Sequence, residues 1–467
     1  MKRILSLILI CLILSASFAV FSTTAADSGF DIRDGVLVSY SGNSAEVTIP
    51  SSVKAVGARA FEGNKDITSL TVPSSVDSIG DKAFYGCSKL KTVKGGANIT
   101  DAGVFAFNGT PYFEESTDEF LMLGKTLLWY NGDSIYITLP SSCLSIAPYA
   151  FYRYLDLKMI RCTSELVSVG AGAFYDCGGL VSVDLPSSVS YIGAYAFDGT
   201  PFISSMGEFA VLGDGILVRY MGAETQVQVP EGVRRIAPFA FRSSKLASVS
   251  IPSSVYSIDP YAFADCVGLK AVDFSDGQVI IGDCAFRGCK KLSSLTTPTT
   301  LGYIGQYAFS GAGLSDVRLL GTDLTVSDNA FKDCKSMRYA LLSNGVTALY
   351  DGAFAGCSSI EGISIPSTAS QVSTDALDGC DKVVVTCPVG SAAFSSLLSN
   401  EMNHIIGDAD SDGELSVLDA TAIQCYAAGI IAYNGAQAAA SDFDFNGAID
   451  IIDAADVQLS IAEITSI

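Results

Sequence analysis

Apolar and polar positions repeat along this chain in a regular unit. In each unit a short apolar run ends at a step such as Pro-Ser-Ser-Val, and an Ile and then an Ala-Phe pair follow, as in the segment 70–84. The period is about 22–23 residues, a length that is typical of a solenoid. Neighbouring Ala-Phe pairs keep this spacing except across two gaps of about double length. The aromatic anchor of the pair recurs at Phe61, Phe84, Phe107, Phe151, Phe174, Phe197, Phe241, Phe263, Phe286, Phe309, Phe331 and Phe354, and Leu377 takes the last place.

The apolar residues of one unit are too few to form a core by themselves. A single unit cannot offset its own ordering entropy, so we expect successive units to stack and to bury ladders of Phe, Val, Ile and Leu. Proline cannot donate a hydrogen bond within a central sheet, so the Pro-Ser-Ser step ends each short strand. The pattern predicts an α/β repeat solenoid of about 13 coils over residues 27–398.

Both double-length gaps carry the same insertion. Each opens with Gly-Thr-Pro, at 109–111 and 199–201, and continues with a glycine-bounded hairpin pattern, of which a third copy lies near residues 34–50. Tyr40, Tyr130 and Tyr220 occupy matching places at equal intervals. The array therefore grew in part by duplication of a block of this length, with a hairpin interrupting the stack in each.

Seven of the thirteen cysteines share one slot, three residues after the aromatic anchor. They are Cys87, Cys177, Cys266, Cys289, Cys334, Cys357 and Cys380. Because other coils place Asn, Thr, Ser or Ala there, buried thiols are the favoured interpretation. A set of disulfides is the alternative in an exported protein. Metal binding is the weakest interpretation, since each coil supplies only one cysteine.

The N-terminal segment and the composition narrow the functional class. Lys2 and Arg3 precede an apolar run and small residues, which predicts a secretory signal over residues 1–26. An uncleaved membrane anchor is the alternative. A net charge of −21 argues against a nucleic-acid ligand. A single His disfavours His-based triads and zinc sites. Since no pair of the 49 carboxylates stands out from the repeat, we expect no enzyme activity and no catalytic residues.

The repeated phrase Ile-Pro-Ser-Ser-Val, Ile-Gly, Ala-Phe, Gly-Cys resembles the BspA-type leucine-rich repeats of exported bacterial surface proteins, over about residues 30–398. The resemblance implies a curved solenoid used for adhesion or protein recognition, located outside the cell or on its surface, with no catalytic residues. The segment 387–398 resembles the terminal cap of that family.

One slot suggests a recognition surface. The residue before the Ala-Phe pair is aromatic in six of the thirteen coils, at Phe105, Tyr149, Tyr195, Phe239, Tyr261 and Tyr307. One slot forms one stripe along a solenoid, and an exposed aromatic stripe suits a protein or sugar ligand. The alternative is that these rings pack over the turns and steady the stack. For the array, protein recognition leads, carbohydrate targeting follows, and a cryptic glycoside hydrolase or peptidase comes last.

The last part of the chain has a different character. Residues 405–467 contain eleven Asp and Glu and no Lys or Arg. Two loops carry oxygen-bearing side chains at matching positions, with a Gly at position 6 and a backbone carbonyl at position 7. This is the spacing that a seven-coordinate hard cation requires, so we predict two Ca²⁺ ions. The ligands are Asp408, Asp410, Asp412, Glu414, Ser416 and Asp419 in the first loop, and Asp442, Asp444, Asn446, Ala448, Asp450 and Asp453 in the second.

A calcium loop followed by one helix, twice, resembles a type I dockerin over residues 407–467, with 399–406 as the linker. The resemblance implies docking onto a cohesin of a scaffoldin, as in the cellulosomes that degrade polysaccharides. The positions it assigns to cohesin contact are Val417, Leu418, Gln424, Cys425, Ile451, Ile452, Gln458 and Leu459. Several are apolar where some dockerins carry Ser-Thr, so the specificity of those families does not transfer. The alternative is that some of these side chains seal the dockerin's own core.

Overall fold

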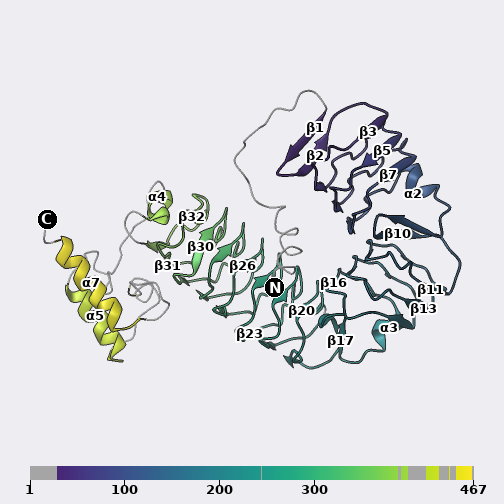
Figure 1. Ribbon diagram of the computed structural model, residues 1–467. Helices are drawn as coiled ribbons and strands as arrows, with labels where there is room; N and C mark the ends of the chain where they lie inside the picture. The colour runs from purple at the N-terminus through teal and green to yellow at the C-terminus, as the bar shows by residue number, and fades with distance from the viewer. Residues whose placement is uncertain are drawn as a thin grey trace. The chain divides into compact units, whose positions relative to one another are not determined.

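The computed structural model describes residues 29–242, 244–387, 391–397, 417–430, 441 and 449–464 (Figure 1). The expected signal segment 1–26 and linker 399–406 lie outside the described residues. Within the described part of the chain, no helix has both the length and the apolar character needed to cross a membrane. Contacts divide the chain into one unit of residues up to Asn98 with Phe105–Ser116, and a second of Ile99–Val104 with residues from Thr117 onward.

The first unit contains two sheets, one with the order β1-β2-β4-β6 and the other with the order β3-β5-β7. Its elements are β1 (Phe30–Arg33), β2 (Val36–Tyr40), β3 (Glu46–Thr48), β4 (Ala55–Val56), β5 (Ser69–Val72), β6 (Ser78–Ile79), β7 (Thr92–Gly95) and the short helix α2 (Pro111–Glu114).

The second unit repeats this arrangement over more coils. Its sheets are β16-β14-β12-β10-β9, β11-β13-β15, β19-β21-β23, β25-β27-β29-β31-β33, and the nine-stranded sheet that runs from β17 to β32. Its elements are β8 (Asp101–Ala102), β9 (Phe120–Leu123), β10 (Thr126–Tyr130), β11 (Tyr136–Thr138), β12 (Ser145–Ile146), β13 (Met159–Arg161), β14 (Ser168–Val169), β15 (Ser182–Asp184), β16 (Tyr191–Ile192), α3 (Pro201–Ser204), β17 (Phe209–Leu212), β18 (Ile216–Tyr220), β19 (Gln226–Gln228), β20 (Arg235–Ile236), β21 (Ser248–Ile251), β22 (Ser257–Ile258), β23 (Ala271–Phe274), β24 (Ile280–Ile281), β25 (Ser294–Thr296), β26 (Tyr303–Ile304), β27 (Asp316–Leu319), β28 (Leu324–Val326), β29 (Tyr339–Leu342), β30 (Val346–Leu349), β31 (Gly362–Ser364), β32 (Gln371–Val372), β33 (Val384–Thr386), α4 (Ala392–Leu397), α5 (Val417–Ala427) and α7 (Ile451–Ile464).

Each coil contributes one strand to each of two sheets, and neighbouring coils pair in parallel. In β5 the residues Leu70 and Val72 are buried while Ser69 and Thr71 are half-buried, which is the period-two pattern of a strand with one face on the core. Pro73 follows β5 directly and its carbonyl accepts a hydrogen bond from Val76 N–H at 3.2 Å. The Pro-Ser-Ser step therefore turns the chain from one sheet to the other, as the sequence predicts.

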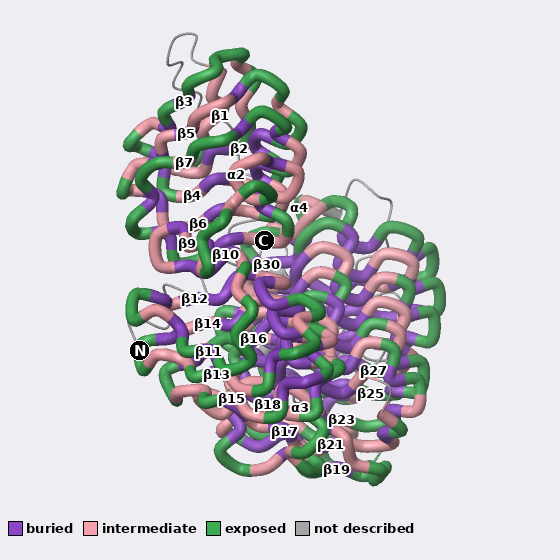
Figure 2. Tube along the Cα trace, turned by 90° about the vertical axis from the view of Figure 1, so that its right-hand side faces the viewer, coloured by how far each residue is buried: buried purple, intermediate pink, exposed green. Residues whose placement is uncertain are grey.

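The anchor phenylalanines form the centre of the core. In the first unit the ring centroids of Phe61, Phe84 and Phe107 are 4.8 and 5.0 Å apart along the stack. In the second unit the spacing between Phe263 and Phe286 is 4.9 Å. This spacing matches the distance between paired strands, so each coil adds one strand to each sheet and one ring to the core. Figure 2 shows the buried segments recurring from coil to coil, and the expected ladders are confirmed.

The hairpins differ from the prediction in one respect. The second strand of each hairpin pairs antiparallel with the first and parallel with the next coil, as β18 does with β17 and β20. Tyr220 then takes the anchor place, because its N–H donates to Ala240 O at 2.8 Å and its ring lies 5.3 Å from that of Phe241. The prediction of 13 coils was therefore too low: the array has about 15, since a hairpin supplies a coil whose anchor is Tyr.

The Gly-Thr-Pro step starts each short helix. Gly199 has a φ of +78°, which a glycine adopts without strain. Thr200 caps α3, because its hydroxyl accepts the N–H of Ile203 at 3.2 Å and donates to Phe197 O at 2.7 Å. Thr110 caps α2 in the same way. These threonines stand in the slot that holds cysteine elsewhere, so that slot closes the turn after the anchor in both versions.

Candidate functional site

The slot before the Ala-Phe pair has a left-handed backbone in all twelve coils that are anchored by a phenylalanine, from Phe61 to Phe354. Its φ values range from +54° to +63° across Arg59, Lys82, Phe105, Tyr149, Gly172, Tyr195, Phe239, Tyr261, Cys284, Tyr307, Asn329 and Gly352. A residue with a Cβ costs about 1 kcal/mol or more in this conformation, whereas Gly and Asn tolerate it. The six aromatic residues therefore stand where the local backbone disfavours them, and their side chains must contribute elsewhere.

Three of these side chains form a continuous stack on the surface, which we call the surface stack. The ring centroids of Tyr195 and Phe239 are 4.7 Å apart, and those of Phe239 and Tyr261 are 5.0 Å apart. All three rings are half-buried. Tyr195 and Phe239 flank the second hairpin in the sequence, so the surface stack continues across a point at which the sheets are interrupted.

Arginines bracket the surface stack. The Arg242 guanidinium lies 4.7 Å from the ring centroid of Tyr195, and that of Arg287 lies 5.9 Å from Tyr261. Asp198 accepts hydrogen bonds from Arg219 at 2.8 Å and from Arg242 at 2.7 Å. Each cation–π contact contributes about 0.5–1 kcal/mol at such a partly exposed site. The stack is therefore held in place from both ends.

The remaining members of the predicted stripe are less tightly grouped. Phe105 is 40% exposed and Tyr307 is 38% exposed. Tyr149 is half-buried and meets the ring of Tyr152 edge-on at 5.8 Å, and Tyr152 stacks on Tyr175 at 6.0 Å. Sequence reasoning missed Tyr152 and Tyr175, although both follow an anchor Phe directly and that regularity is visible in the sequence.

The stacked arrangement bears on the kind of ligand. Rings that lie 4.7–5.0 Å apart at interplanar angles of 23° and 9° cover each other's faces and leave mainly their edges and hydroxyl groups outward. A sugar packs on an open ring face, whereas a protein surface packs against edges, hydroxyls and flanking arginines equally well. The geometry of the surface stack therefore favours a protein ligand over a sugar.

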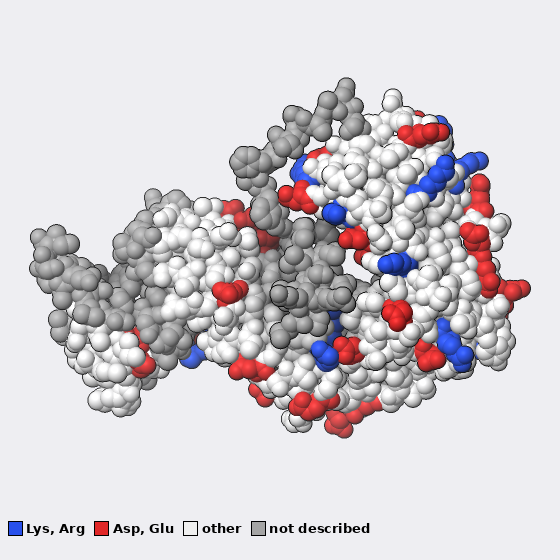
Figure 3. Space-filling model, in the orientation of Figure 1, with Lys and Arg blue, Asp and Glu red and all other residues white. Residues whose placement is uncertain are grey.

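Charge is distributed without a single basic patch on the described face of Figure 3, where Lys and Arg are scattered among Asp and Glu. Most ion pairs are exposed. An exception joins Arg235 to Asp259, with Arg235 Nε 2.7 Å from Asp259 Oδ2 and the Asp259 side chain 2% exposed. Burial raises the pKa of Asp259, and the opposing charge of Arg235 lowers it. This pair is structural, because Ser257 and the Tyr191 ring occupy its remaining sides.

The cysteine slot forms a buried ladder of free thiols. Each of the seven slot cysteines has its Sγ 3.0–3.6 Å from the carbonyl oxygen of the anchor Phe one coil earlier, as Cys177 has to Phe151. All cysteines among the described residues are free, so buried thiols are confirmed over disulfides. Burial raises the pKa of Cys87 to about 11 and that of Cys177 to about 12. Such thiols are poor nucleophiles at neutral pH.

This ladder predicts a protected labelling pattern. At pH 8 a thiol with its pKa raised from 9.0 to about 11 contains about 100-fold less thiolate. We expect N-ethylmaleimide to leave Cys87, Cys177 and Cys266 unmodified in the folded protein and to modify them fully in guanidinium chloride, as read by mass spectrometry of peptides. The half-buried Cys425 serves as the internal control. Labelling of the ladder thiols at the rate of Cys425 would contradict the prediction.

In the tail the two described helices pack through small and aliphatic residues. Ala420 and Ile423 of α5 meet Ala454 and Val457 of α7, and all four are fully buried. Of the predicted calcium ligands, Asp450 and Asp453 have described side chains. Asp419 lies on α5, and its side chain is outside the described set. The other ligands lie outside the described residues: Asp408, Asp410, Asp412, Glu414, Ser416, Asp442, Asp444, Asn446 and Ala448.

Asp450 and Asp453 lie at the start of α7. Asp453 is completely buried at the start of α7, and its Oδ2 accepts the N–H of Asp450 at 2.8 Å. Asp450 Oδ1 accepts the N–H of Ile452 at 2.7 Å. A buried carboxylate is costly unless its charge is compensated, and the helix N-terminus and the Asp450 N–H both offer compensation here. The described residues alone group no three acidic, His or Cys side chains around a metal.

The residues that the dockerin resemblance assigns to cohesin contact differ in how far their side chains are exposed. Leu418, Ile451 and Ile452 are 63%, 60% and 53% exposed. Gln458 is also exposed, and Gln424 and Cys425 are half-buried. The side chains of Val417 and Leu459 lie outside the described set. The described core between α5 and α7 is formed by other residues. The exposed side chains of Leu418, Ile451 and Ile452 are therefore not part of it.

The chain matches the family model of the BspA type leucine rich repeat region, over residues 38–117, 125–207, 220–338 and 257–384, and that model describes a repeat region rather than a catalytic domain. No curated protein matches the chain. Among solved structures, a leucine-rich repeat protein from Eubacterium ventriosum is 21% identical, with a TM-score of 0.36 over 74% of this chain and 88% of that one.

A leucine-rich cell surface protein from Faecalibacterium prausnitzii is 23% identical, with a TM-score of 0.27 over 81% and 98% of the two chains. The pneumococcal vaccine antigen PcpA is 18% identical, with a TM-score of 0.34 over 80% and 95%. The family match covers more than half of the chain and the same coils that the structure forms. The chain belongs to the BspA-type leucine-rich repeat family.

Proposed function

We propose that this is a secreted, non-catalytic recognition protein. Its repeat array binds a protein ligand outside the cell or at the cell surface, and its C-terminal tail docks, with two Ca²⁺ bound, onto a cohesin of a scaffoldin. The assembly would operate in a polysaccharide-degrading complex of the cellulosome type. Family membership supports the non-catalytic array, and the paired loop spacing supports the calcium-dependent tail.

The observation that carries the recognition role is the surface stack. Tyr195, Phe239 and Tyr261 occupy a left-handed slot that holds non-aromatic residues in other coils, among them Gly172 and Asn329. The fold therefore does not require aromatic residues there, and their backbone cost of about 1 kcal/mol each has to be offset. Stacking offsets part of this cost, and recognition of a ligand accounts for the presence of aromatic residues at these stacked positions.

A triple variant separates recognition from structural support. We expect Tyr195→Asn, Phe239→Asn and Tyr261→Asn together to leave the melting temperature within a few degrees of the parent. Relief of left-handed strain roughly balances the lost stacking, each being about 1 kcal/mol per site. Binding to a panel of immobilised extracellular proteins, measured by surface plasmon resonance, should weaken at least tenfold for every protein that the parent binds.

The matched control is Tyr85→Asn, which removes another exposed aromatic residue from a repeat slot outside the surface stack. That variant should bind as the parent does. A triple variant that melts far below the parent yet keeps its binding would show that the rings only steady the coils. Binding of plant polysaccharides that the triple substitution abolishes would instead favour carbohydrate targeting by this surface.

A further inference from the structure

The sheets of the second unit contain a break that no hairpin explains. One sheet ends at β23 and the next begins at β25, although the two strands belong to consecutive coils. On the other side of the same coils β24 pairs with β26 without interruption, through Ile280 with Tyr303 and Ile281 with Ile304. The coils therefore keep their spacing on one side and separate locally on the other.

Departures from the repeat coincide with this break. Phe274 is the last residue of β23, at a repeat position where most coils have an aliphatic residue. In the parallel pairing of β21 with β23 its partner is Ile251. Its ring is half-buried and meets Phe286 edge-on at 6.2 Å. The next coil places Thr297 in the same slot, and the Pro-Ser-Ser step after β23 is replaced by Ser-Asp-Gly at 275–277. Positions at which a regular repeat departs from its consensus are candidate functional sites.

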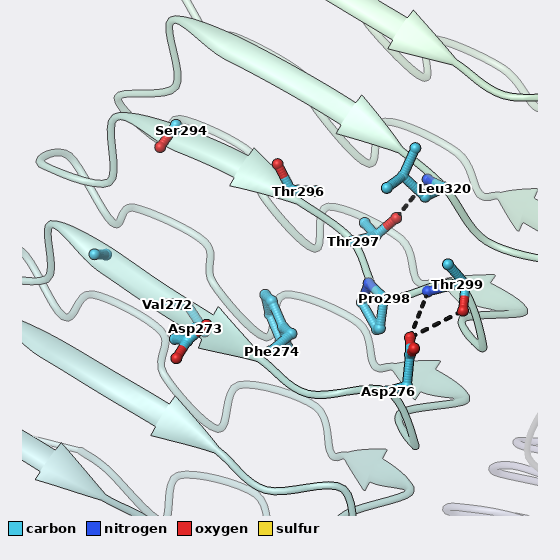
Figure 4. A pocket seen from close by; sticks show the side chains of 11 residues that line it. Val272, Asp273, Phe274, Asp276, Ser294, Thr296, Thr297, Pro298, Thr299 and Leu320 are labelled. Carbon is cyan, nitrogen blue, oxygen red and sulfur yellow. Dashed lines mark hydrogen bonds between the residues drawn. The ribbon is translucent and has the colours of Figure 1, made fainter. Parts of the chain in front are cut away.

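Side-chain hydrogen bonds fix the edges of the break (Figure 4). Asp276 Oδ1 accepts both the N–H and the hydroxyl of Thr299 at 2.9 Å. Thr297 Oγ1 accepts the N–H of Leu320 at 2.8 Å. Before the break, Ser293 N–H still donates to Lys270 O at 3.4 Å. The two coils are therefore tied to each other on both sides of the break by bonds that exist without a ligand, which fixes the walls and lowers the cost of ordering on binding.

A cleft of about 400 Å³ opens between the two strands. Its polar lining comes from Asp273, Asp276, Ser294 and Thr296, and its apolar lining includes Phe274 and Leu320. No Lys or Arg is among the described residues that line it. The volume lies within the range of small-molecule sites, and the lining combines hydrogen-bond acceptors and hydroxyl groups with one aromatic ring.

We propose that this cleft binds a neutral sugar residue. The sugar hydroxyls would donate to the carboxylates of Asp273 and Asp276 and exchange hydrogen bonds with Ser294 and Thr296, while its C–H face packs on Phe274. The two carboxylates repel anionic ligands such as uronates or phosphates. An inserted peptide strand does not fit, because it needs flanking strands roughly 9.6 Å apart, and β23 and β25 have Cα atoms within 8 Å of each other.

The test uses saturation-transfer NMR and calorimetry on the full chain with methyl β-D-glucoside, methyl β-D-galactoside and cellobiose, and with D-glucuronate as the charged comparison. We expect saturation transfer to the ring protons of at least one neutral sugar and none to glucuronate. Asp273→Ala and Phe274→Leu should each weaken that binding at least tenfold. Phe274→Leu restores the type of residue usual in this slot, so it is expected to fold.

Asp184→Ala is the matched control, because Asp184 occupies the same slot as Asp273 in another coil and lies on the surface. It should bind sugar as the parent does. The triple variant of the surface stack should also bind sugar normally, which keeps this inference separate from the proposed protein recognition. Absence of signal from all three neutral sugars, equal binding of glucuronate, or unchanged affinity in Asp273→Ala would overturn the proposal.

Discussion

Removal of calcium is expected to abolish binding of the full chain to the cohesin that we propose as its partner. The two predicted loops contain eight aspartates within short stretches of sequence, and binding of a cation by such a loop would relieve the repulsion between these like charges. If the tail binds calcium as we propose, the free energy of binding also contributes to folding of the tail. Calorimetry of the chain against a panel of cohesins should give tight binding in Ca²⁺ and at least 1,000-fold weaker binding in excess chelator.

Substitutions at position 1 of both loops should reproduce the effect of the chelator. Asp408→Ala with Asp442→Ala removes one predicted ligand from each ion, and Asp316→Ala, at an exposed position of β27, serves as the control. The melting of the array should not change in either case. Full cohesin affinity in chelator would refute the calcium requirement. Binding of calcium without binding of any cohesin would recast the tail as a calcium-stabilised cap.

The exposed apolar residues of the tail supply a second arm of the same experiment. Leu418 lies on α5 and Ile452 on α7, at matching places in the two halves. Because each half carries its own apolar face, one substitution alone leaves the other face intact. Leu418→Glu and Ile452→Glu together should abolish docking and leave calcium binding intact, since neither residue belongs to the buried core of the helix pair.

The repeat period made most of the array predictable, because a single slot has a single environment in every coil. The buried anchors and the free thiols both follow from that rule. The Tyr-anchored coils were missed, although Tyr130 and Tyr220 each stand one repeat period after the preceding anchors, Phe107 and Phe197. The surrounding sequence indicated only a hairpin. It did not show that the second strand of each hairpin also begins the next run of parallel strands.

The candidate sites were predictable only in part. Six aromatic residues in one slot indicated a stripe, and Gly172, Asn329 and Gly352 in that slot contained the signal for a left-handed backbone. The stacking of Tyr195 on Phe239 across the hairpin depends on where two distant coils meet, which spacing does not specify. The cleft beside Phe274 depends on one strand pairing that fails to form. A repeat in the sequence predicts strand pairing only where the pairing is itself regular.

Stability is expected to fall steeply at alkaline pH. The pKa values of Cys87, Cys143 and Cys266 are raised by burial from 9.0 to about 11, and those of Cys162 and Cys177 to about 12. A raised pKa in the folded state means that the contribution is complete below pH 9 and is lost as the pH rises toward 11–12. Each thiol contributes about 1.4 kcal/mol per pH unit in that window. Five such thiols can therefore remove most of a typical folding free energy of about 5–15 kcal/mol.

Urea unfolding at pH 7.5, 9.0 and 10.0 measures this loss, with the transition midpoint expected to drop sharply between the last two. Tyrosine and lysine titrate in the same range, so the thiol share is isolated by a variant with Cys87→Ala, Cys177→Ala and Cys266→Ala. Alanine is compatible with the slot, because Ala312 occupies it in another coil and is buried there. The variant should be somewhat less stable at pH 7.5 but should lose less stability between pH 9.0 and 10.0. The same pH dependence in both proteins would show that the buried thiols do not control the alkaline limit, and that the phenols or ammonium groups do.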